Sequence, residues 1–458
     1  MDKRNQMSKL GLVCYTFGGA VGAGLFVTLP AAIETTGISI VLAIITASIV
    51  CFFAYFYDMA ISSFASVKGG DYGHISFVSA PLISGVFGLT NIFYAMGNYM
   101  YAEGALTYVS YALPGIKNKI VLWTVVLLTV FSIIDYFGAN LGEKVSTVMT
   151  VTLTAGILLL MVLGMSHIDF TAISAGSDKG GEAFFKNGFS GFSQAVAYCV
   201  WIVGGIGTSA VTFSRYVKKS TRVVPQAIIA VSIILGVIAC LLCVVCAYAV
   251  PQEIATQGLG AVARVVMPKA LFYAFAIGSG AFALLTSLQT FMAGFSAGLS
   301  AYADQGYLPR IFTKRSKNGY PWVVGIAIWL LGVIPYLFDI SLGTVIAYAC
   351  APVYFCLIYV NWKCIKLPEL YPDRWKKCML HMPLGLWKAL CVFSAVCATY
   401  LVYCYCAGFS LVEWGQMMLT IAFMFAWAYY RMKADHVDVA AMEKEKEDII
   451  ADAMAYED

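Results

Sequence analysis

The sequence predicts an all-α, polytopic membrane protein, and three observations support this class. Of the 458 residues, 60% are hydrophobic and only 12% are charged. Apolar runs of about 20 residues, the length that crosses a bilayer as a helix, recur from one end of the chain to the other. Two glycine-rich clusters, at 17–26 and 203–209, interrupt such runs where a continuous helix would otherwise be expected.

Twelve apolar segments are expected to cross the membrane. Clusters of Pro, Gly or charged residues separate them, for example at 68–71 and 113–115. The expected spans are 9–33, 38–64, 82–111, 119–138, 145–165, 189–214, 224–250, 268–303, 321–338, 341–363, 386–408 and 411–431.

The distribution of positive charge predicts the topology. With the N-terminus placed in the cytoplasm, six of the 29 Lys and Arg residues fall outside and the other 23 inside. This asymmetry follows the positive-inside rule and predicts that both termini are cytoplasmic. The chain starts without the pattern of a cleaved signal, so we expect none to be removed. A twelve-span domain at 1–433 is then followed by an acidic cytoplasmic tail at 434–458, for which the sequence indicates no role.

The spans are expected to form two repeats. Spans one to five, at 9–165, and spans six to ten, at 189–363, are equal in number. Because five is odd, the second set enters the membrane from the opposite side, which makes the repeat inverted. Each set begins with a glycine-interrupted span, and the last two spans, at 386–431, lie outside the repeat. Interrupted helices in corresponding positions indicate the substrate site of a secondary transporter.

The first interruption places Val21, Gly22, Ala23 and Gly24 in the middle of span one. A helix that breaks here would start a new half-helix, whose unpaired N–H groups form a positive end. A carboxylate is the natural ligand for such an end. These four residues are therefore predicted to bind substrate.

The second interruption contains Gly204, Gly205, Gly207 and Thr208. It offers the same two kinds of helix end with the opposite polarity, so that carbonyl groups can receive an ammonium. Together the two interruptions fit the zwitterion of an α-amino acid. Close packing between spans is the alternative for either cluster alone, but two clusters that begin two repeats favour a substrate site.

Acidic residues within spans are costly and usually functional. Glu103 in span three is expected to be a cation counter-ion or a proton site, or else to cap a hydrogen-bond network with Tyr99 or Tyr101. Asp58 and Asp135 lie nearer the cytoplasmic ends, where structural pairing or snorkelling of the side chain is the better interpretation.

Four further side chains border the expected site. The hydroxyls of Thr286 and Ser287 would suit a hard cation such as Na⁺, but ordinary interhelical hydrogen bonding is the favoured interpretation. Trp201 and Phe291 are predicted to cover a bound side chain, with simple aromatic packing as the alternative.

Enzyme chemistry is not indicated. The sequence has no HExxH or phosphate-binding loop, and its GxSxG match at 294–298 lies within an apolar span instead of a strand–turn–helix unit. The 14 Cys are scattered without metal-ligand spacing. We therefore expect no cofactor, no metal site and, at a net charge of only +4, no nucleic acid partner.

Three stretches resemble the amino acid–polyamine–organocation (APC) superfamily. They are GAVGAGLF at 19–26, the region from Trp201 to VKKSTRVVP at 217–225, and ADQGYLPRIF at 303–312 followed by NGYP at 318–321. The resemblance implies a LeuT-type fold of 5+5 inverted repeats with helices 1 and 6 broken. It covers spans one to ten, and the last two by number only.

Within the superfamily, Met96-Gly97-Asn98 is similar to the branch of arginine/agmatine and lysine/cadaverine exchangers. The resemblance implies that Asn98 contributes to the substrate site and that Phe291 is an aromatic gate, while Ala23 stands where the branch often has serine. The branch usually carries an acid just after the sixth-span break, where this chain has Gly207 and Thr208. A neutral or aromatic amino acid is therefore slightly favoured over a cationic one.

The expected function is secondary active transport. An antiporter or permease would move amino acids, or their decarboxylated amines, across the cell membrane by alternating access, as a monomer or homodimer. Substrate would bind between spans one, three, six, eight and ten. The alternative is a proton- or sodium-coupled uptake symporter, and a substrate sensor built on a transporter fold is the competing class.

Overall fold

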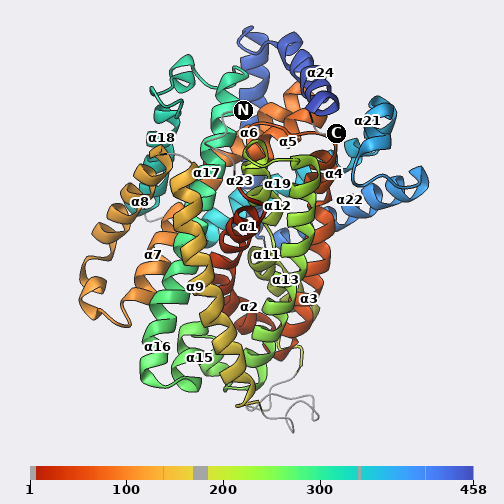
Figure 1. Ribbon diagram of the computed structural model, residues 1–458. Helices are drawn as coiled ribbons and strands as arrows, with labels where there is room; N and C mark the ends of the chain where they lie inside the picture. The colour runs from red at the N-terminus through yellow and green to blue at the C-terminus, as the bar shows by residue number, and fades with distance from the viewer. Residues whose placement is uncertain (1–6, 138, 169–183, 339–341, 408, 457–458) are drawn as a thin grey trace.

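The computed structural model describes residues 7–137, 139–168, 184–338, 342–407 and 409–456. Within these ranges the regular structure is helical, apart from an isolated bridge between Met7 and Val217. The helices form one elongated bundle with α1 (Lys9–Ala23) at its centre (Figure 1). This central helix packs against α9, α12, α13 and α17, whose bounds follow.

The first half of the chain contains, after α1, the helices η2 (Gly24–Thr28), α2 (Leu29–Thr36), η3 (Gly37–Ser39), α3 (Ile40–Ala54), α4 (Phe56–Phe64), α5 (Gly70–Val78), α6 (Pro81–Ala95), α7 (Asn98–Val109), η4 (Pro114–Lys119), α8 (Ile120–Phe137) and α9 (Ala139–Met165). The second half contains α11 (Gly188–Val203), α12 (Ile206–Thr212), η5 (Ser214–Tyr216), α13 (Ser220–Tyr248), α14 (Gln252–Ala255), α15 (Leu259–Val266), α16 (Lys269–Phe275), η6 (Ala276–Ala281), α17 (Phe282–Asp304), η7 (Arg310–Thr313), α18 (Trp322–Phe338) and α19 (Leu342–Cys364). The C-terminal region contains α20 (Leu367–Leu370), α21 (Pro372–Lys377), α22 (Leu384–Cys406), α23 (Leu411–Lys433) and α24 (Val439–Tyr456).

Helices occupy all twelve ranges that the hydropathy pattern predicts as spans. In the described part of the chain, eight helical stretches are long and apolar enough to cross a membrane, and the first of them, Lys9–Phe64, contains two expected spans. Expected span three is divided by a turn at Met96 and Gly97 into α6 and α7. The apolar part of α18, Trp322–Pro335, is shorter than a full span.

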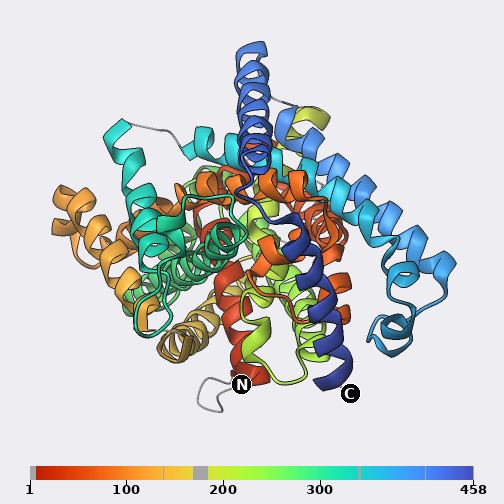
Figure 2. The ribbon, with the colours of Figure 1, turned by 90° about the horizontal axis from the view of Figure 1, so that it is seen from above.

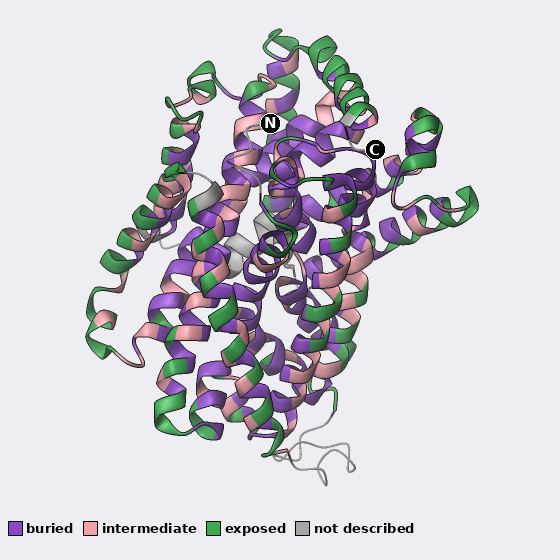
Figure 3. Cartoon of the chain, viewed as in Figure 1, coloured by how far each residue is buried: buried purple, intermediate pink, exposed green. Residues whose placement is uncertain are grey.

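Apolar side chains cover the outside of the bundle. Exposed residues lie on the outer helices, including α8 and α22, while the central helices are mostly buried (Figure 3). Val130 on α8, Val151 on α9 and Leu419 on α23 are exposed examples. A surface of this kind is stable where lipid chains replace water as the solvent.

The two glycine-rich interruptions differ in form. Span six breaks, because Gly204 is extended and Gly205 adopts a left-handed conformation with φ of 70°. Span one does not break: Gly24 has helical angles, and η2 continues α1 as a π-helix. The prediction of a broken first helix is therefore wrong in form. Glycine lowers the cost of leaving the α-helix, and here the chain uses that freedom to widen the helix by i→i+5 hydrogen bonding.

The C-terminal tail folds back on the bundle as α24. The end of α24 lies on the same side of the molecule as the N-terminus (Figures 1 and 2). Met442, Ile449 and Ala453 are buried, and their spacing places them along one face of the helix. The Nζ atom of Lys446 donates to the carbonyl of Ser79 over 3.3 Å, which ties the tail to the loop between α5 and α6.

Candidate functional site

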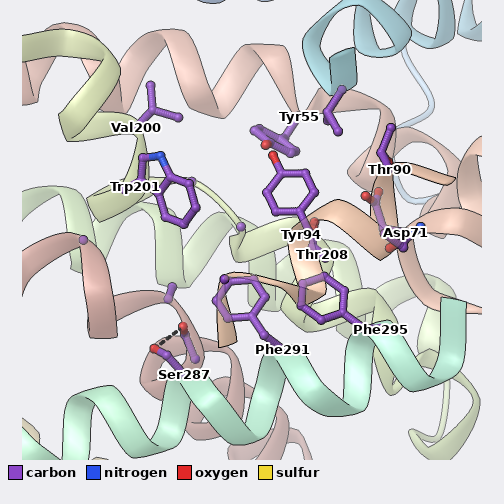
Figure 4. A pocket seen from close by; sticks show the side chains of 18 of the residues that line it. Tyr55, Asp71, Thr90, Tyr94, Val200, Trp201, Thr208, Ser287, Phe291 and Phe295 are labelled. Atoms are coloured by element: carbon purple, nitrogen blue, oxygen red, sulfur yellow. Dashed lines mark hydrogen bonds between the residues drawn. The ribbon is translucent and has the colours of Figure 1, made fainter. Parts of the chain in front are cut away.

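A cavity of about 90 Å³ lies where expected spans one, three, six, eight and ten meet. Its walls come from α1 and η2, α6 and α7, α11 and α12, α17 and α19, with further side chains from α5 and α22 (Figure 4). The predicted position of the substrate site between these five spans thus contains an actual cavity.

The break in span six opens onto this cavity. Gly204 and Gly205 both line it. The break separates the carbonyl end of α11 from the N–H end of α12, so both kinds of unpaired helix end meet at one place. Only glycine adopts the left-handed conformation of position 205 without strain. The local sequence therefore creates a polar backbone patch in the middle of an apolar span.

Spans one and six touch through their backbones beside the cavity. A Cβ atom at Gly24 would lie 2.0 Å from the carbonyl oxygen of Trp201 and 2.3 Å from the Cα of Ile202. A Cβ atom at Gly22 would lie 1.8 Å from the hydroxyl oxygen of Ser287. Glycine at these two positions is required by close approach to α11 and α17.

Two hydroxyls of α17 cap the carbonyls of α1. Thr286 donates to the carbonyl oxygen of Gly18 over 2.8 Å, and Ser287 donates to that of Gly19 over 2.7 Å. Both bonds are buried and join the two helices. This geometry gives the pair an interhelical role, which is the second of the two interpretations that the sequence allowed.

Aromatic rings stack along one wall of the cavity. Tyr101 stacks on Phe291 with ring centroids 5.3 Å apart, and Phe291 stacks on Phe295 at 5.9 Å. Tyr94 continues the column at 6.3 Å from Phe295. The indole of Trp201 lies on the opposite side of the drawn pocket from Phe295 (Figure 4). Aromatic side chains therefore border the cavity on both sides.

An acidic residue reaches the cavity from α5. Asp71 lines the cavity and accepts a hydrogen bond from the phenol of Tyr57. In α4 and α5, Asp58 and His74 are fully buried, and the Oδ1 atom of Asp58 lies 2.9 Å from the Nδ1 atom of His74. Asp58 is therefore paired, as the sequence indicated, although its partner is a histidine within the bundle.

Seven of the predicted site residues line the cavity: Gly24, Trp201, Gly204, Gly205, Thr208, Ser287 and Phe291. Six others do not line it in the described structure: Val21, Gly22, Asn98, Glu103, Gly207 and Thr286. The backbone of Ala23 ends α1, and its side chain lies outside the described residues.

The residues off the cavity have other neighbours. Asn98 is fully buried, and its Cβ lies 3.5 Å from where a side chain of Gly332 in α18 would begin. Glu103 is half-buried on α7. The structure thus brings the two glycine-rich interruptions, Ser287 and the aromatic residues together at the cavity. Asn98 and Glu103 of span three lie outside that group.

Sequence reasoning missed Asp71, Asn91 and the tyrosines of the cavity. Asp71 belongs to the Lys-Gly-Gly-Asp cluster at 68–71, which predicted only a separator between spans. Its position at the cavity depends on the packing of α5 against α6, α12 and α17, which the local sequence does not indicate. Asn91 lies on α6, seven residues before Asn98, which begins α7 after the turn at Met96 and Gly97.

The fold and the cavity define a class of protein. A multi-span helical membrane protein with a central cavity at an interrupted helix has the architecture of a secondary transporter. The model of the amino acid permease family matches residues 7–427 of this chain. The chain belongs to the amino acid permease family, within the APC superfamily, whose members are transporters and not enzymes. The family implies the LeuT-type fold.

Proposed function

We propose that the protein exchanges amino acids, or an amino acid for its decarboxylated amine, across the cell membrane by alternating access. Both termini would face the cytoplasm, and the unit would work as a monomer or homodimer. The observation that carries the proposal is the cavity at the span-six break, where helix ends of both polarities meet beside a column of aromatic rings.

Substrate would bind with its zwitterionic end at Gly204 and Gly205. The carbonyl end of α11 suits the ammonium group, and the N–H end of α12 suits the carboxylate. The sequence predicted that the first interruption binds the carboxylate and the second the ammonium group. We now place both groups at the second interruption, because span one continues through Gly24 as a π-helix. The side chain would then lie between Trp201 and Phe291.

Movement of α12 relative to α11 would open the cavity to one side at a time. The left-handed Gly205 is the only residue between the two helices that has φ of the wrong sign for a helix. Hinges are often single residues of this kind at the ends of elements. Because the hinge is also the binding position, substrate contacts and gating would involve the same backbone.

Counterflow in proteoliposomes tests the proposal. Liposomes are loaded with one unlabelled amino acid or amine at a time, and entry of a labelled mixture of L-amino acids is followed with and without ion gradients. Acceleration by internal substrate without a gradient is the result expected of an exchanger. Uptake that needs a proton or sodium gradient and ignores internal substrate would make the protein a symporter, which is the alternative. Binding without any flux would favour a sensor.

A further inference from the structure

A buried acid–imidazole pair packs against α12. Asp58 on α4 and His74 on α5 are both fully buried and joined through Oδ1 and Nδ1 at 2.9 Å. The other oxygen of Asp58, Oδ2, and the other nitrogen of His74, Nε2, are also buried and have no hydrogen-bond partner within the described structure. Buried polar atoms almost always have partners, so two orphans on one bonded pair require an explanation.

The carboxylate of Asp58 lies against the backbone of α12. A Cβ atom at Gly207 would lie 2.2 Å from Oδ2 of Asp58 and 2.9 Å from its Cγ. Any side chain at position 207 would therefore occupy the space of the carboxylate. Gly207 is one of the two residues that stand where the exchanger branch usually has an acid. In this chain the carboxylate of Asp58, from α4, occupies the space beside it.

Asp71 extends this group of residues to the cavity. It lies three residues before His74 on α5, a spacing that places both on one side of the helix. One oxygen of Asp71 accepts from Tyr57, the neighbour of Asp58 in α4, and the residue lines the cavity. Asp71, His74 and Asp58 thus form a group that extends from the cavity to the backbone of α12 at Gly207.

No lysine or arginine in the described structure forms an ion pair with either acid. Charged side chains on the neighbouring helices are exposed or engaged elsewhere. Arg222 is exposed, and Lys363 of α19 lies over the ring of Tyr359. Lys388 pairs with Glu369, Arg315 with Asp304, Lys446 with Glu443, and Arg374 donates to the carbonyl of Phe64. The titratable groups that face the acids are Tyr57 of α4 and the thiols of Cys356 and Cys364 on α19. Helices α3, α6 and α12 carry no acidic or basic side chain.

A buried carboxylate without a cation or a full set of donors is costly, by several kcal/mol for an isolated charge. A proton removes that cost. On Asp58 it would leave a neutral acid beside a neutral imidazole, and on His74 it would make an ion pair. With no proton, a negative charge would remain against the α12 backbone.

We propose that Asp58 and His74 form a proton-binding site, with Asp71 as its connection to the cavity, that couples proton movement to the position of α12. The ligand is a single proton, which the pair takes up or releases as the cavity changes sides. This inference rests on the proposed transport function for its coupling, and on the pair alone for proton binding. It places the coupling site on α4 and α5, away from Glu103.

Infrared difference spectroscopy of the purified, reconstituted protein tests proton binding without any substrate. The bulk pH is stepped from acidic to alkaline, and the C=O stretch of protonated carboxyl groups is followed. In the unmodified protein a carboxyl band should disappear on alkalinisation, and Asp58→Asn should lack that band. His74→Gln should keep the band with a displaced midpoint, because the partner of Oδ1 changes. The matched control is Asp135→Asn, a second acid held by Tyr320 at 2.9 Å, which should leave the Asp58 band unchanged.

Flux measurements test the coupling. In proteoliposomes given a labelled L-amino acid mixture, an inward proton gradient should stimulate net uptake by the unmodified protein and by Asp135→Asn. Asp58→Asn should lose this stimulation and keep counterflow. Equal stimulation in all variants, or an Asp58→Asn spectrum identical to that of the unmodified protein, would overturn the proposal. If no protein moves amino acids at all, the proposed function fails, while the infrared result still decides whether the pair binds a proton.

Discussion

The close contact of spans one and six at Gly24 yields a quantitative prediction. In Gly24→Ala the new methyl group would lie 2.0 Å from the carbonyl oxygen of Trp201 and 2.3 Å from the Cα of Ile202, whereas ordinary contact begins at 3.4 Å. Both neighbours are backbone atoms, so neither can rotate away. The two backbones would have to part by about 1.4 Å. Overpacking typically costs about 1–3 kcal/mol, and backbone neighbours place this case near the upper end.

The separation would move α11 and its end at the cavity. A loss of about 3 kcal/mol that fell entirely on substrate binding would correspond to roughly 150-fold weaker affinity. Counterflow in proteoliposomes and thermal melting in detergent measure the two consequences, which are lost flux and a lower melting temperature. Gly415→Ala on α23 is the control, because nothing lies within 4 Å of its added methyl group. If Gly24→Ala melted and transported like the control, the packing argument would be refuted.

Three further substitutions test separate parts of the structure. Gly205→Ala forces an L-residue to φ of 70°, although Phe291 at 3.5 Å leaves room for the methyl group. The backbone strain of about 1–2 kcal/mol should weaken substrate binding roughly tenfold. Unchanged affinity would contradict the role of Gly205 as a hinge. Ser287→Ala removes the buried hydrogen bond to the Gly19 carbonyl, so the melting temperature should fall by an amount equivalent to about 1–3 kcal/mol of stability. A loss confined to sodium-dependent flux would instead support a cation site. Arg431→Gln breaks two bonds to the carbonyl of Gly306 and should lower the melting temperature with little change in affinity, which ligand-binding assays would check.

The positions of the helices could be predicted because the hydropathy pattern is strong and local. A bilayer permits only fully hydrogen-bonded segments of fixed length, so each apolar run corresponds to a helix. The second interruption was predictable for a similar reason: consecutive glycines at 204 and 205 have no side-chain contacts to hold them helical. The family match over residues 7–427 confirms the superfamily that the glycine-rich and loop stretches indicated.

The exact form of span one could not be predicted, since glycine permits a break, a π-helix or close packing alike. Here Gly24 serves both close packing on Trp201 and the start of the π-helix. The role of Asp71 was equally hidden, because a charged residue after two glycines is typical of a connecting loop. Only the three-dimensional return of α5 beside α12 brings it to the cavity. Local patterns identify which segments are helices, whereas contacts between distant segments decide which side chains form the site.

The docking of α24 places the C-terminal tail on the same side of the bundle as the N-terminus. Its buried face includes Ile449, which is only 7% exposed. Near its end, Asp452 acts on Arg215, the residue of η5 that follows α12. Burial lowers the pKa of Arg215, and the negative charge of Asp452 acts in the opposite direction. The charge of the tail therefore acts on the segment that follows α12.

Ile449→Asp should undock this helix. The substitution removes a buried apolar side chain, worth about 1.5–3 kcal/mol, and places a carboxylate where burial of an unpaired charge costs several kcal/mol more. Because α24 lies outside the expected spans, it can leave the bundle without unfolding them. Trypsin added to vesicles with the tail side outward should then cleave faster after Lys444 and Lys446. Asp448→Asn on the exposed side of the same helix is the matched control and should be cleaved at the original rate. Equal cleavage of both variants would show that the buried face of α24 does not hold the tail in place.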